Sequence, residues 1–361
     1  MRCRSTCHSA PGQPRDQLLT SMSDPQYNIP LGSKILVTGG NGFIGSHVVD
    51  QLLELGYSVR GTVRTPKSWL NKLFDGKYGE GKFETFILPD LTDQTGCDRA
   101  VDGISGIIHV AADVSMNPDP SVLIPNAIKA TLNLLNAASK HPTIKQVVLT
   151  SSSTAAYTPS PNEERIVVTQ DTWNDSAVKA AWDEHTPSQA KGYYVYIASK
   201  TETERMAFKW VEENGNPFVL NSVLPSITFG KILAPEIRGS TQSFITSILK
   251  GDEWPMSMIP PQWYVNVTDV ARLHVAALLS PSIRMERVFA FAAPQNWTDV
   301  LEILRKLHPD NLVLPQKPEN KGRDLSHVVP SERARQILND FFGRSGWVSL
   351  EESIAEGTID L

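Results

Sequence analysis

A glycine-rich turn between a strand-like run and a helix-like run constrains the fold of this chain more than any other feature. Residues 34–40, KILVTGG, are apolar and end in two glycines, and residues 46–56, SHVVDQLLELG, carry apolar side chains at helical spacing. Gly39, Gly42 and Gly45 mark this junction at intervals of three. Such glycines let the backbone approach a pyrophosphate, and the following helix offers free N–H groups and the positive end of its dipole. The turn predicts a dinucleotide site, but glycines also punctuate ordinary turns, so the surrounding segments must support it.

Strand-like and helix-like segments alternate after this turn. The strand-like runs are nearly continuous apolar stretches, at residues 57–64, 83–88, 106–112, 145–152 and 218–225. Helical patterns lie between them, as in residues 121–141. This alternation is typical of a parallel sheet that helices cover on both faces. The chain is therefore expected to be α/β, with a doubly wound parallel sheet of the Rossmann type and its ligand at the carboxyl ends of the strands.

The pattern loosens after about residue 225, where helix-like segments are separated by proline-rich loops. Helices are expected at residues 240–251, 267–280 and 296–308. Residues 33–225 are expected to form the dinucleotide-binding domain with the catalytic residues. Residues 226–361 are expected to form mainly a smaller substrate-binding lobe, interleaved with that domain. Residues 1–32 lack an apolar period and are interpreted as a disordered leader or an over-extended start.

Composition excludes several classes of function. The 361 residues carry a formal net charge of -5, so nucleic acid is not expected as a partner. Since no apolar run approaches the roughly 20 residues that cross a bilayer, no membrane segment is expected either. The three cysteines, Cys3, Cys7 and Cys97, form no metal-ligand pair, which favours a metal-free protein of the reducing cytoplasm. Three N-x-S/T sequons are interpreted as chance matches, at Asn174, Asn266 and Asn296.

The end of the second strand-like run indicates which dinucleotide binds. An acidic residue there would accept the ribose 2′-hydroxyl of NAD, whereas a basic residue accommodates the 2′-phosphate of NADP. The run GYSVRGTVRTPK contains no acid but has Arg60, Arg64 and Lys67. Alternation along a strand places both arginines on one face, so either could reach the phosphate. Arg64 is nearer the carboxyl end and Lys67 follows in the turn, so NADPH is the expected cofactor.

Three tyrosines precede a lysine in the segment GYYVYIASK. On a helix, side chains four residues apart share a face, and Lys200 comes four residues after Tyr196. Tyr193 and Tyr194 have no such neighbour. A nearby cation lowers the pKa of a phenol from its usual value near 10, and a phenol of this kind can protonate a carbonyl oxygen that is becoming an alkoxide. Tyr196 is therefore the candidate proton donor.

A run of hydroxyl side chains ends the fifth strand-like segment, VVLTSSSTAAY. It falls at the carboxyl edge of the expected sheet, where a polar group could hold the carbonyl oxygen. The run also fits a polar loop with local backbone hydrogen bonds. The spacing alone leaves the catalytic register open among Ser151, Ser152 and Ser153.

Together these segments resemble the extended short-chain dehydrogenases/reductases. Within that superfamily the chain most resembles the branch of dihydroflavonol reductases, cinnamoyl-CoA reductases and yeast NADPH-dependent carbonyl (ketone and aldehyde) reductases. The yeast enzymes carry a similar proline-proline-glutamine stretch. The matching segments run in family order from residue 34 to about 278: LVTGGNGFIGSHVVDQLLELGYSVRGTVR, PDLTD, HVAADVS, NAIKATLNLLNAAS, VVLTSSS, YVYIASKTETE, LNSVLPSITFG and MIPPQWYVNVTDVARLHVAAL.

The resemblance implies roles for individual residues. Tyr196 matches the proton donor, Lys200 the lysine that binds the nicotinamide ribose and lowers the phenol pKa, and Ser152 the serine that polarises the carbonyl. The cofactor-binding positions match the pyrophosphate turn at Gly39, Gly42, Phe43, Ile44 and Gly45, the 2′-phosphate contacts at Arg64 and Lys67, the adenine side at Asp90 and Leu91, the ribose side at Ala111, and the carboxamide side at Pro225 and Ser226. One departure is Ala130-Thr131 in place of the usual Gly-Thr, which is a packing change.

The implied reaction is the reversible reduction of a ketone or aldehyde by NADPH, in a monomer or homodimer. Large apolar side chains favour a small apolar or aromatic carbonyl substrate, although each of them also suits a core: Tyr157, Trp173, Trp182, Phe229, Trp254, Met256, Met258, Ile259 and Trp263, with Gln262 as a polar exception. Two alternatives stay open. An NAD-dependent nucleotide-sugar epimerase/dehydratase shares the turn and the Tyr/Lys pair but needs basic residues for a second diphosphate. A non-catalytic dinucleotide-binding regulator needs only the turn.

Overall fold

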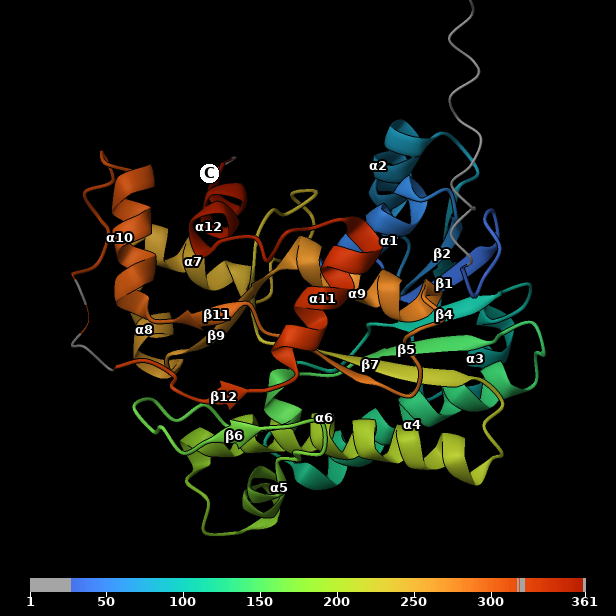
Figure 1. The fold of residues 1–361 in the computed structure, drawn as a ribbon, viewed down its shortest axis with the longest axis horizontal. Helices are drawn as coiled ribbons and strands as arrows, with labels where there is room; N and C mark the ends of the chain where they lie inside the picture. The colour runs from blue at the N-terminus through green and yellow to red at the C-terminus, as the bar shows by residue number, and fades with distance from the viewer. Residues whose placement is uncertain (1–26, 317, 319–321, 360–361) are drawn as a thin grey trace, which may run out of the picture.

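A parallel sheet forms the centre of the computed structural model, which describes residues 27–316, 318 and 322–359 (Figure 1). Within these residues the sheet has seven strands in the order β10-β7-β5-β4-β1-β2-β3. All neighbouring strands are parallel. The strands are β1 (Lys34–Thr38), β2 (Ser58–Val63), β3 (Phe83–Ile87), β4 (Gly106–His109), β5 (Gln146–Thr150), β7 (Val219–Pro225) and β10 (Arg287–Ala290). The strand order reverses between β1 and β4, which is where a doubly wound fold binds its ligand.

Helices cover both faces of this sheet (Figure 1). One face buries apolar side chains against α1 (Phe43–Glu54), α2 (Ser68–Tyr78), α9 (Val267–Leu279) and α11 (Ser331–Phe342). The other face packs against α3 (Gln94–Ala100), α4 (Pro120–Ser139) and α6 (Ser188–Glu213). Because both faces are covered, the strands are apolar throughout, as the sequence predicted. The predicted α/β, doubly wound fold is confirmed.

A smaller lobe lies beside the carboxyl ends of the main sheet. Its three-stranded sheet has the order β11-β9-β8, formed by β8 (Ile227–Phe229), β9 (Gln262–Asn266) and β11 (Ala293–Gln295). Its helices are α7 (Gln242–Leu249), α8 (Trp254–Met258), α10 (Trp297–Leu307) and α12 (Leu350–Thr358). The chain after residue 225 also supplies β10, α9 and α11 to the main domain. The two parts therefore interleave and share no single boundary.

A long segment leads from β5 to α6 and is held by two distant parts of the chain. It contains the short η1 turn (Ser153–Ala155), β6 (Val167–Val168) and α5 (Asp175–Trp182). Strand β6 pairs in parallel with β12 (His327–Val328), and α5 packs against α6. The segment is thus anchored between α6 and the last quarter of the chain.

The folded chain begins before residue 33. Residues 1–26, with Cys3 and Cys7, lie outside the described residues. Ile29, however, is buried, and its carbonyl oxygen accepts a hydrogen bond from the Tyr57 hydroxyl at 2.8 Å. The Asn28 N–H donates to the Leu279 carbonyl at 2.8 Å. Placing residues 27–32 with the leader was therefore wrong. Tyr27 and Ile29 pack on the core of the main domain, and backbone bonds add to this packing, but so short a stretch shows no periodicity that reveals it.

The three sequon asparagines each cap a helix. Asn174 accepts from the Ala177 N–H at the start of α5, Asn266 from Thr268 at α9, and Asn296 from Asp299 at α10. An asparagine followed by a hydroxyl residue is therefore explained here by helix capping. No helix among the described residues is long and apolar enough to span a membrane.

Three buried histidines predict acid sensitivity of the fold. His47, His109 and His274 bind the Lys231 carbonyl and the hydroxyls of Thr38 and Thr150, respectively, at 2.7–2.8 Å. Burial lowers their pKa values from 6.5 to about 4, about 3 and about 4. Since the unfolded chain binds more protons below pH 6.5, stability is complete above that pH and is lost as the pH falls.

We expect each of these histidines to remove about 2 kcal/mol of unfolding free energy at pH 5 relative to neutral pH. Chemical denaturation between pH 7 and pH 5 measures this loss. His274→Gln should flatten the pH dependence, whereas substitution of the exposed His185 by Gln should leave it unchanged. A stability that is constant across this range would contradict the prediction.

Candidate active site

The turn between β1 and α1 can be built only with glycine at two positions. Gly39 adopts φ +67°, a backbone conformation that residues with a Cβ rarely adopt. A Cβ on Gly45 would overlap the carbonyl oxygen of Gly39, so the first turn of α1 lies directly against the strand end. These two glycines create the close approach of backbone to ligand that the sequence predicted.

The start of α1 is suited to an anion. Gly42 is its N-cap and has no side chain that could accept hydrogen bonds from the first backbone N–H groups of the helix, such as those of Phe43 and Ile44. The first turn of α1, which the structure describes in full, carries no acidic side chain. The uncapped helix end and the glycine cradle therefore fit the pyrophosphate of a dinucleotide.

The end of β4 lies beside this turn. A Cβ on Gly39 would lie 3.1 Å from the Cα of Ala111. The Thr38 hydroxyl oxygen accepts hydrogen bonds from the N–H groups of Val110 and Ala111, both at 3.0 Å, and also binds His109. Thr38 thereby holds Ala111 against the glycine turn at the point where the strand order reverses.

The two arginines of β2 have different surroundings. Arg60 donates from Nε to Glu84 Oε1 at 2.7 Å and from Nη1 to the carbonyls of Ala100 and Asp102 at 3.0 and 2.8 Å. These three bonds hold its guanidinium group at the amino-terminal half of the strand, so Arg60 is not expected to contact the 2′-phosphate. Arg64 directly follows the strand and is exposed, and Lys67 is the half-buried N-cap of α2. Both stay predicted contacts to the 2′-phosphate.

Asp90 and Leu91 follow β3 at the same edge of the sheet. Asp90 accepts from the Thr92 N–H and hydroxyl, both at 2.8 Å, and these bonds lower the pKa of its carboxyl group. Pro225 ends β7, and the hydroxyl of Ser226 donates to the Ala290 carbonyl at 3.1 Å. All four residues lie at the carboxyl edge, where their cofactor contacts remain predictions.

The end of β5 meets the middle of α6, and this contact distinguishes the three serines. The Ser152 hydroxyl lies close enough to the Tyr196 phenol to affect its pKa, and Ser152 Oγ also shares a hydrogen bond with Thr154 Oγ1 at 2.9 Å. Ser151 instead donates to Glu204 Oε2 at 2.8 Å, and Ser153 begins the η1 turn. Of the three hydroxyls whose register the sequence left open, Ser152 is the one that is brought to Tyr196.

Lys200 lies one turn after Tyr196 and points to the same strand end. Its ammonium group donates to the Thr150 carbonyl at 3.0 Å. Burial lowers the pKa of Lys200 to about 8, and the nearby Glu204 carboxylate opposes that shift. The lysine is therefore only partly protonated in mildly alkaline solution, which makes its charge sensitive to neighbouring groups.

The expected lowering of the Tyr196 pKa is wrong for this structure. Burial raises the pKa of the phenol, and the nearby Ser152 hydroxyl only opposes the rise. Lys200 makes no contribution that offsets burial, and its ammonium group points to the Thr150 carbonyl instead. Helical spacing predicted the shared face correctly, but it could not predict which acceptor the ammonium group would find.

The apolar side chains proposed as a substrate wall are dispersed. Phe229 and Met256 are buried in the core of the small lobe, while Trp182, Trp254 and Met258 are exposed. The Tyr157 hydroxyl is buried and donates to Asp324 Oδ2 at 2.7 Å. The Trp173 ring contacts two guanidinium groups, those of Arg205 and Arg287, whose carbons lie 5.1 and 3.9 Å from the ring centroid. Ile259, Gln262 and Trp263 are half-buried and stay candidates for the wall.

The sequence did not predict the buried contact of Glu204 with Ser151 and with Arg287 on β10. The available signal was the spacing of Tyr196, Lys200 and Glu204, which places all three on one stripe of α6. Arg287 could not be linked to that stripe because it is 83 residues away in the chain. Within the described part of the chain, no group of three or more His, Cys, Asp or Glu side chains could hold a metal ion.

The sheet, the glycine turn at its reversal point and the convergence of Ser152, Tyr196 and Lys200 at the end of β5 define the class of short-chain dehydrogenases/reductases. A family model for the "NAD dependent epimerase/dehydratase family" matches residues 35–289. The chain belongs to this family, whose members are extended short-chain dehydrogenases/reductases, and the predicted recognition is confirmed.

Individual relatives cover nearly the whole chain. Ketoreductase nvfG of Aspergillus novofumigatus is 44% identical over 92% of this chain and 98% of its own. Aldehyde reductase 2 of Sporidiobolus salmonicolor is 41% identical over 91% and 96%. The solved structure of Gre2 from Candida albicans in complex with NADPH is 25% identical, with a TM-score of 0.73 over 92% of this chain and 98% of that one. The chain thus resembles reductases along their full length.

Proposed function

We propose that this protein is an NADPH-dependent carbonyl reductase that converts a ketone or aldehyde to an alcohol. The observation that carries the proposal is the meeting of the Ser152 hydroxyl, the Tyr196 phenol and the Lys200 ammonium at the carboxyl end of β5. The ketoreductase and aldehyde reductase relatives support the same reaction type.

Different residues of the chain bind the cofactor and act on the substrate carbonyl. The glycine turn and the start of α1 bind the pyrophosphate, and Ala111, Pro225 and Ser226 border the rest of the cofactor. Bound NADPH supplies the hydride. Ser152 donates a hydrogen bond to the carbonyl oxygen and stabilises the negative charge that develops there. Tyr196 gives its proton to that oxygen, and the raised phenol pKa keeps this proton available at neutral pH.

Lys200 is proposed to hold the nicotinamide ribose and to supply positive charge near the phenol. This role requires the ammonium group to leave the Thr150 carbonyl or to share it with the ribose. Because the pKa of Lys200 is about 8, the reductive rate should fall as the pH rises through that value.

A panel of aldehydes, α-diketones, β-keto esters and aryl ketones, followed by NADPH oxidation, tests the proposed function. Small apolar or aromatic carbonyls should be reduced. Firm NADPH binding with no turnover on any carbonyl would instead favour a regulator. Epimerisation of a nucleotide sugar with tightly bound NAD would instead favour the epimerase alternative.

Cofactor choice gives a separate prediction. Arg64→Ser and Lys67→Ala should each weaken NADPH binding about tenfold or more, since each removes a charge-assisted hydrogen bond to the 2′-phosphate. NADH affinity should stay unchanged, and the exposed Lys82 replaced by Ala serves as the control. Titration of NADPH and NADH fluorescence with each variant measures both affinities. Equal loss of NADH and NADPH affinity would remove these residues from the 2′-phosphate site.

A further inference from the structure

A buried carboxylate lies directly behind the proposed catalytic residues. Glu204 belongs to α6, one turn after Lys200, and its side chain is fully buried. Its two oxygens accept four hydrogen bonds. Ser151 Oγ donates to Oε2 at 2.8 Å and Ser222 Oγ donates to Oε1 at 2.5 Å. Arg287 donates from Nε to Oε1 at 3.0 Å and from Nη2 to Oε2 at 3.2 Å. This carboxylate joins α6 to β5, β7 and β10.

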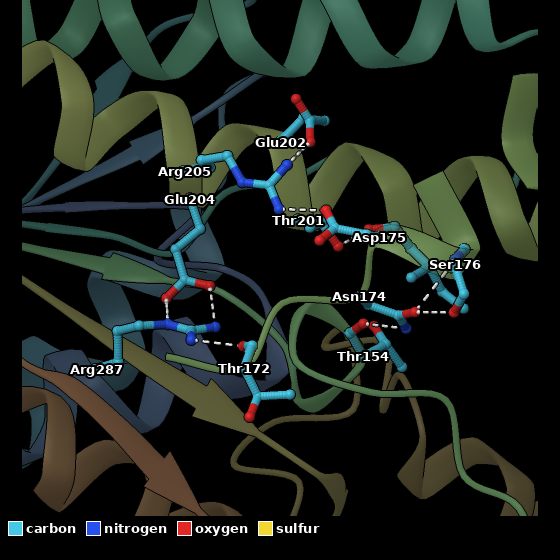
Figure 2. Close-up of polar contacts among 12 residues, drawn as sticks. Thr154, Thr172, Asn174, Asp175, Ser176, Thr201, Glu202, Glu204, Arg205 and Arg287 are labelled. Atoms are coloured by element: carbon cyan, nitrogen blue, oxygen red, sulfur yellow. Dashed lines mark hydrogen bonds and ion pairs between the residues drawn. The ribbon is translucent and has the colours of Figure 1, made fainter. Parts of the chain in front are cut away.

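The partner guanidinium extends the connection to the segment between β5 and α6. Figure 2 shows Arg287 between Glu204 on one side and Thr172 on the other. Its Nη1 donates to the carbonyls of Gln170 and Thr172 at 2.7 and 2.8 Å. Its guanidinium carbon also lies 3.9 Å from the centroid of the Trp173 ring. Arg287 therefore fixes three positions of this segment, at residues 170, 172 and 173.

A buried ion pair of this kind is weak support for stability. Removing two charges from water has a large free-energy cost, and apolar residues of similar volume are often as stable. The geometry is instead specific, since every oxygen of Glu204 and all but one N–H group of Arg287 have an assigned partner. Such satisfied networks fix one arrangement of the elements they join.

The position of Ser151 links this network to the reaction. Ser151 lies between Thr150, whose carbonyl holds Lys200, and Ser152, which contacts Tyr196. Its own N–H is fixed by the Val223 carbonyl at 2.8 Å. Each of three successive residues at the strand end thus contacts a side chain of α6, and these three side chains come from successive turns of the helix. A shift of Ser151 would move both neighbours relative to Tyr196 and Lys200.

We propose that Glu204 and Arg287 are positioning residues for the carbonyl reduction. The carboxylate holds the end of β5 against the Tyr196–Lys200 stripe through Ser151, and the guanidinium holds residues 170–173 against β10. This inference rests on the proposed function, because the residues that it positions are those assigned to proton transfer and cofactor binding.

The charge of Glu204 adds an effect on Lys200. The titratable groups that interact with the ammonium are Glu204 on α6, His109 on β4 and His274 on α9. Both histidines are neutral above pH 5, because burial lowers their pKa values to about 3 and about 4. Glu204 is therefore the nearby group that favours the protonated lysine at working pH. Loss of Glu204 should move the deprotonation of Lys200 to lower pH.

Two variants separate the geometric effect from the charge effect. Ser151→Ala leaves the ion pair in place and cuts its link to the strand end, so kcat should fall about tenfold or more with an unchanged alkaline limb of the pH profile. Glu204→Leu combined with Arg287→Met replaces the pair by apolar side chains, so kcat should fall and the alkaline limb should move to lower pH by about half a unit or more.

The matched control is Arg205→Met. Arg205 is the next residue on α6, lies 5.1 Å from the same Trp173 ring and binds Asp175, but it has no link to Ser151 (Figure 2). Its variant should keep the wild-type kcat and pH profile. Hydrogen exchange should increase around residues 150–156 in the Ser151→Ala variant and not in the control.

The measurements are kcat and KM between pH 6 and pH 9.5, together with NADPH affinity over the same range, which needs no turnover. Wild-type kcat in both variants, together with an unmoved alkaline limb in the double variant, would overturn the positioning role. If the double variant does not fold, the kcat of the Ser151→Ala variant tests the positioning role by itself. If the wild-type protein reduces no carbonyl, the proposed function fails. In that case the positioning role is tested without turnover. It is wrong if the variants change neither the pH dependence of NADPH affinity nor the hydrogen exchange around residues 150–156.

Discussion

Replacing Tyr196 by phenylalanine is expected to lower kcat for carbonyl reduction by about a hundredfold or more. Positioned general acids contribute about 10²–10⁴-fold, and phenylalanine keeps the ring while removing the proton. NADPH affinity should change little, because Lys200 and the glycine turn remain. Steady-state kinetics and NADPH fluorescence titration on the same preparation measure the two quantities.

The neighbouring tyrosines provide the control for this variant. Tyr194 packs on the apolar cluster of α4, α5 and α6, and its ring lies 6.2 Å from that of Tyr193. Tyr194→Phe should therefore retain kcat within a few-fold. If the Tyr196 variant kept wild-type turnover, or if the Tyr194 variant lost as much, Tyr196 could not be the proton donor.

Placing alanine at Gly45 is expected to lower NADPH affinity by about a hundredfold, equivalent to about 2.7 kcal/mol. The added Cβ would overlap the Gly39 carbonyl oxygen, so α1 must move away from the end of β1. That movement widens the cradle for the pyrophosphate and turns the first N–H groups of the helix away from it. Overpacking should also remove about 1–3 kcal/mol of stability. Isothermal titration and thermal unfolding measure the two effects.

Gly76 is the matched control, because it lies inside α2 with an ordinary helical backbone, and a Cβ added there would meet no atom within 4 Å. Alanine at this position should bind NADPH like the wild type and stabilise the helix by up to about 1 kcal/mol. An intact NADPH affinity in the Gly45 variant would show that the turn does not hold the pyrophosphate.

Local patterns predicted the fold because its decisive signals are short in range. Apolar runs marked the strands, and the expected helices at residues 240–251, 267–280 and 296–308 differ from α7, α9 and α10 by no more than two residues at each end. The glycine spacing placed the turn, and the four-residue spacing placed Tyr196 and Lys200 on one face. Each of these features is set by neighbours along the chain.

The features that the sequence could not predict depend on contacts between distant segments. Alternation placed Arg60 and Arg64 on the same face, but Glu84 stands beside Arg60 in the adjacent strand and binds it. The choice among the three serines depends on Glu204. Ser151 donates its hydrogen bond to this carboxylate, and Ser152 is the serine that contacts Tyr196. Such pairings require the register between elements, which periodicity does not contain.

In the proposed reaction a hydride passes from NADPH to the carbonyl carbon of the substrate. Reduction of an accepted carbonyl with NADPH deuterated at C4 of the nicotinamide ring, followed by mass spectrometry of the alcohol, tests it most directly. We expect one deuterium on the carbinol carbon with one of the two C4 epimers of the labelled cofactor, and almost no product with the Tyr196→Phe variant. Alcohol that carries no deuterium with either epimer would contradict it.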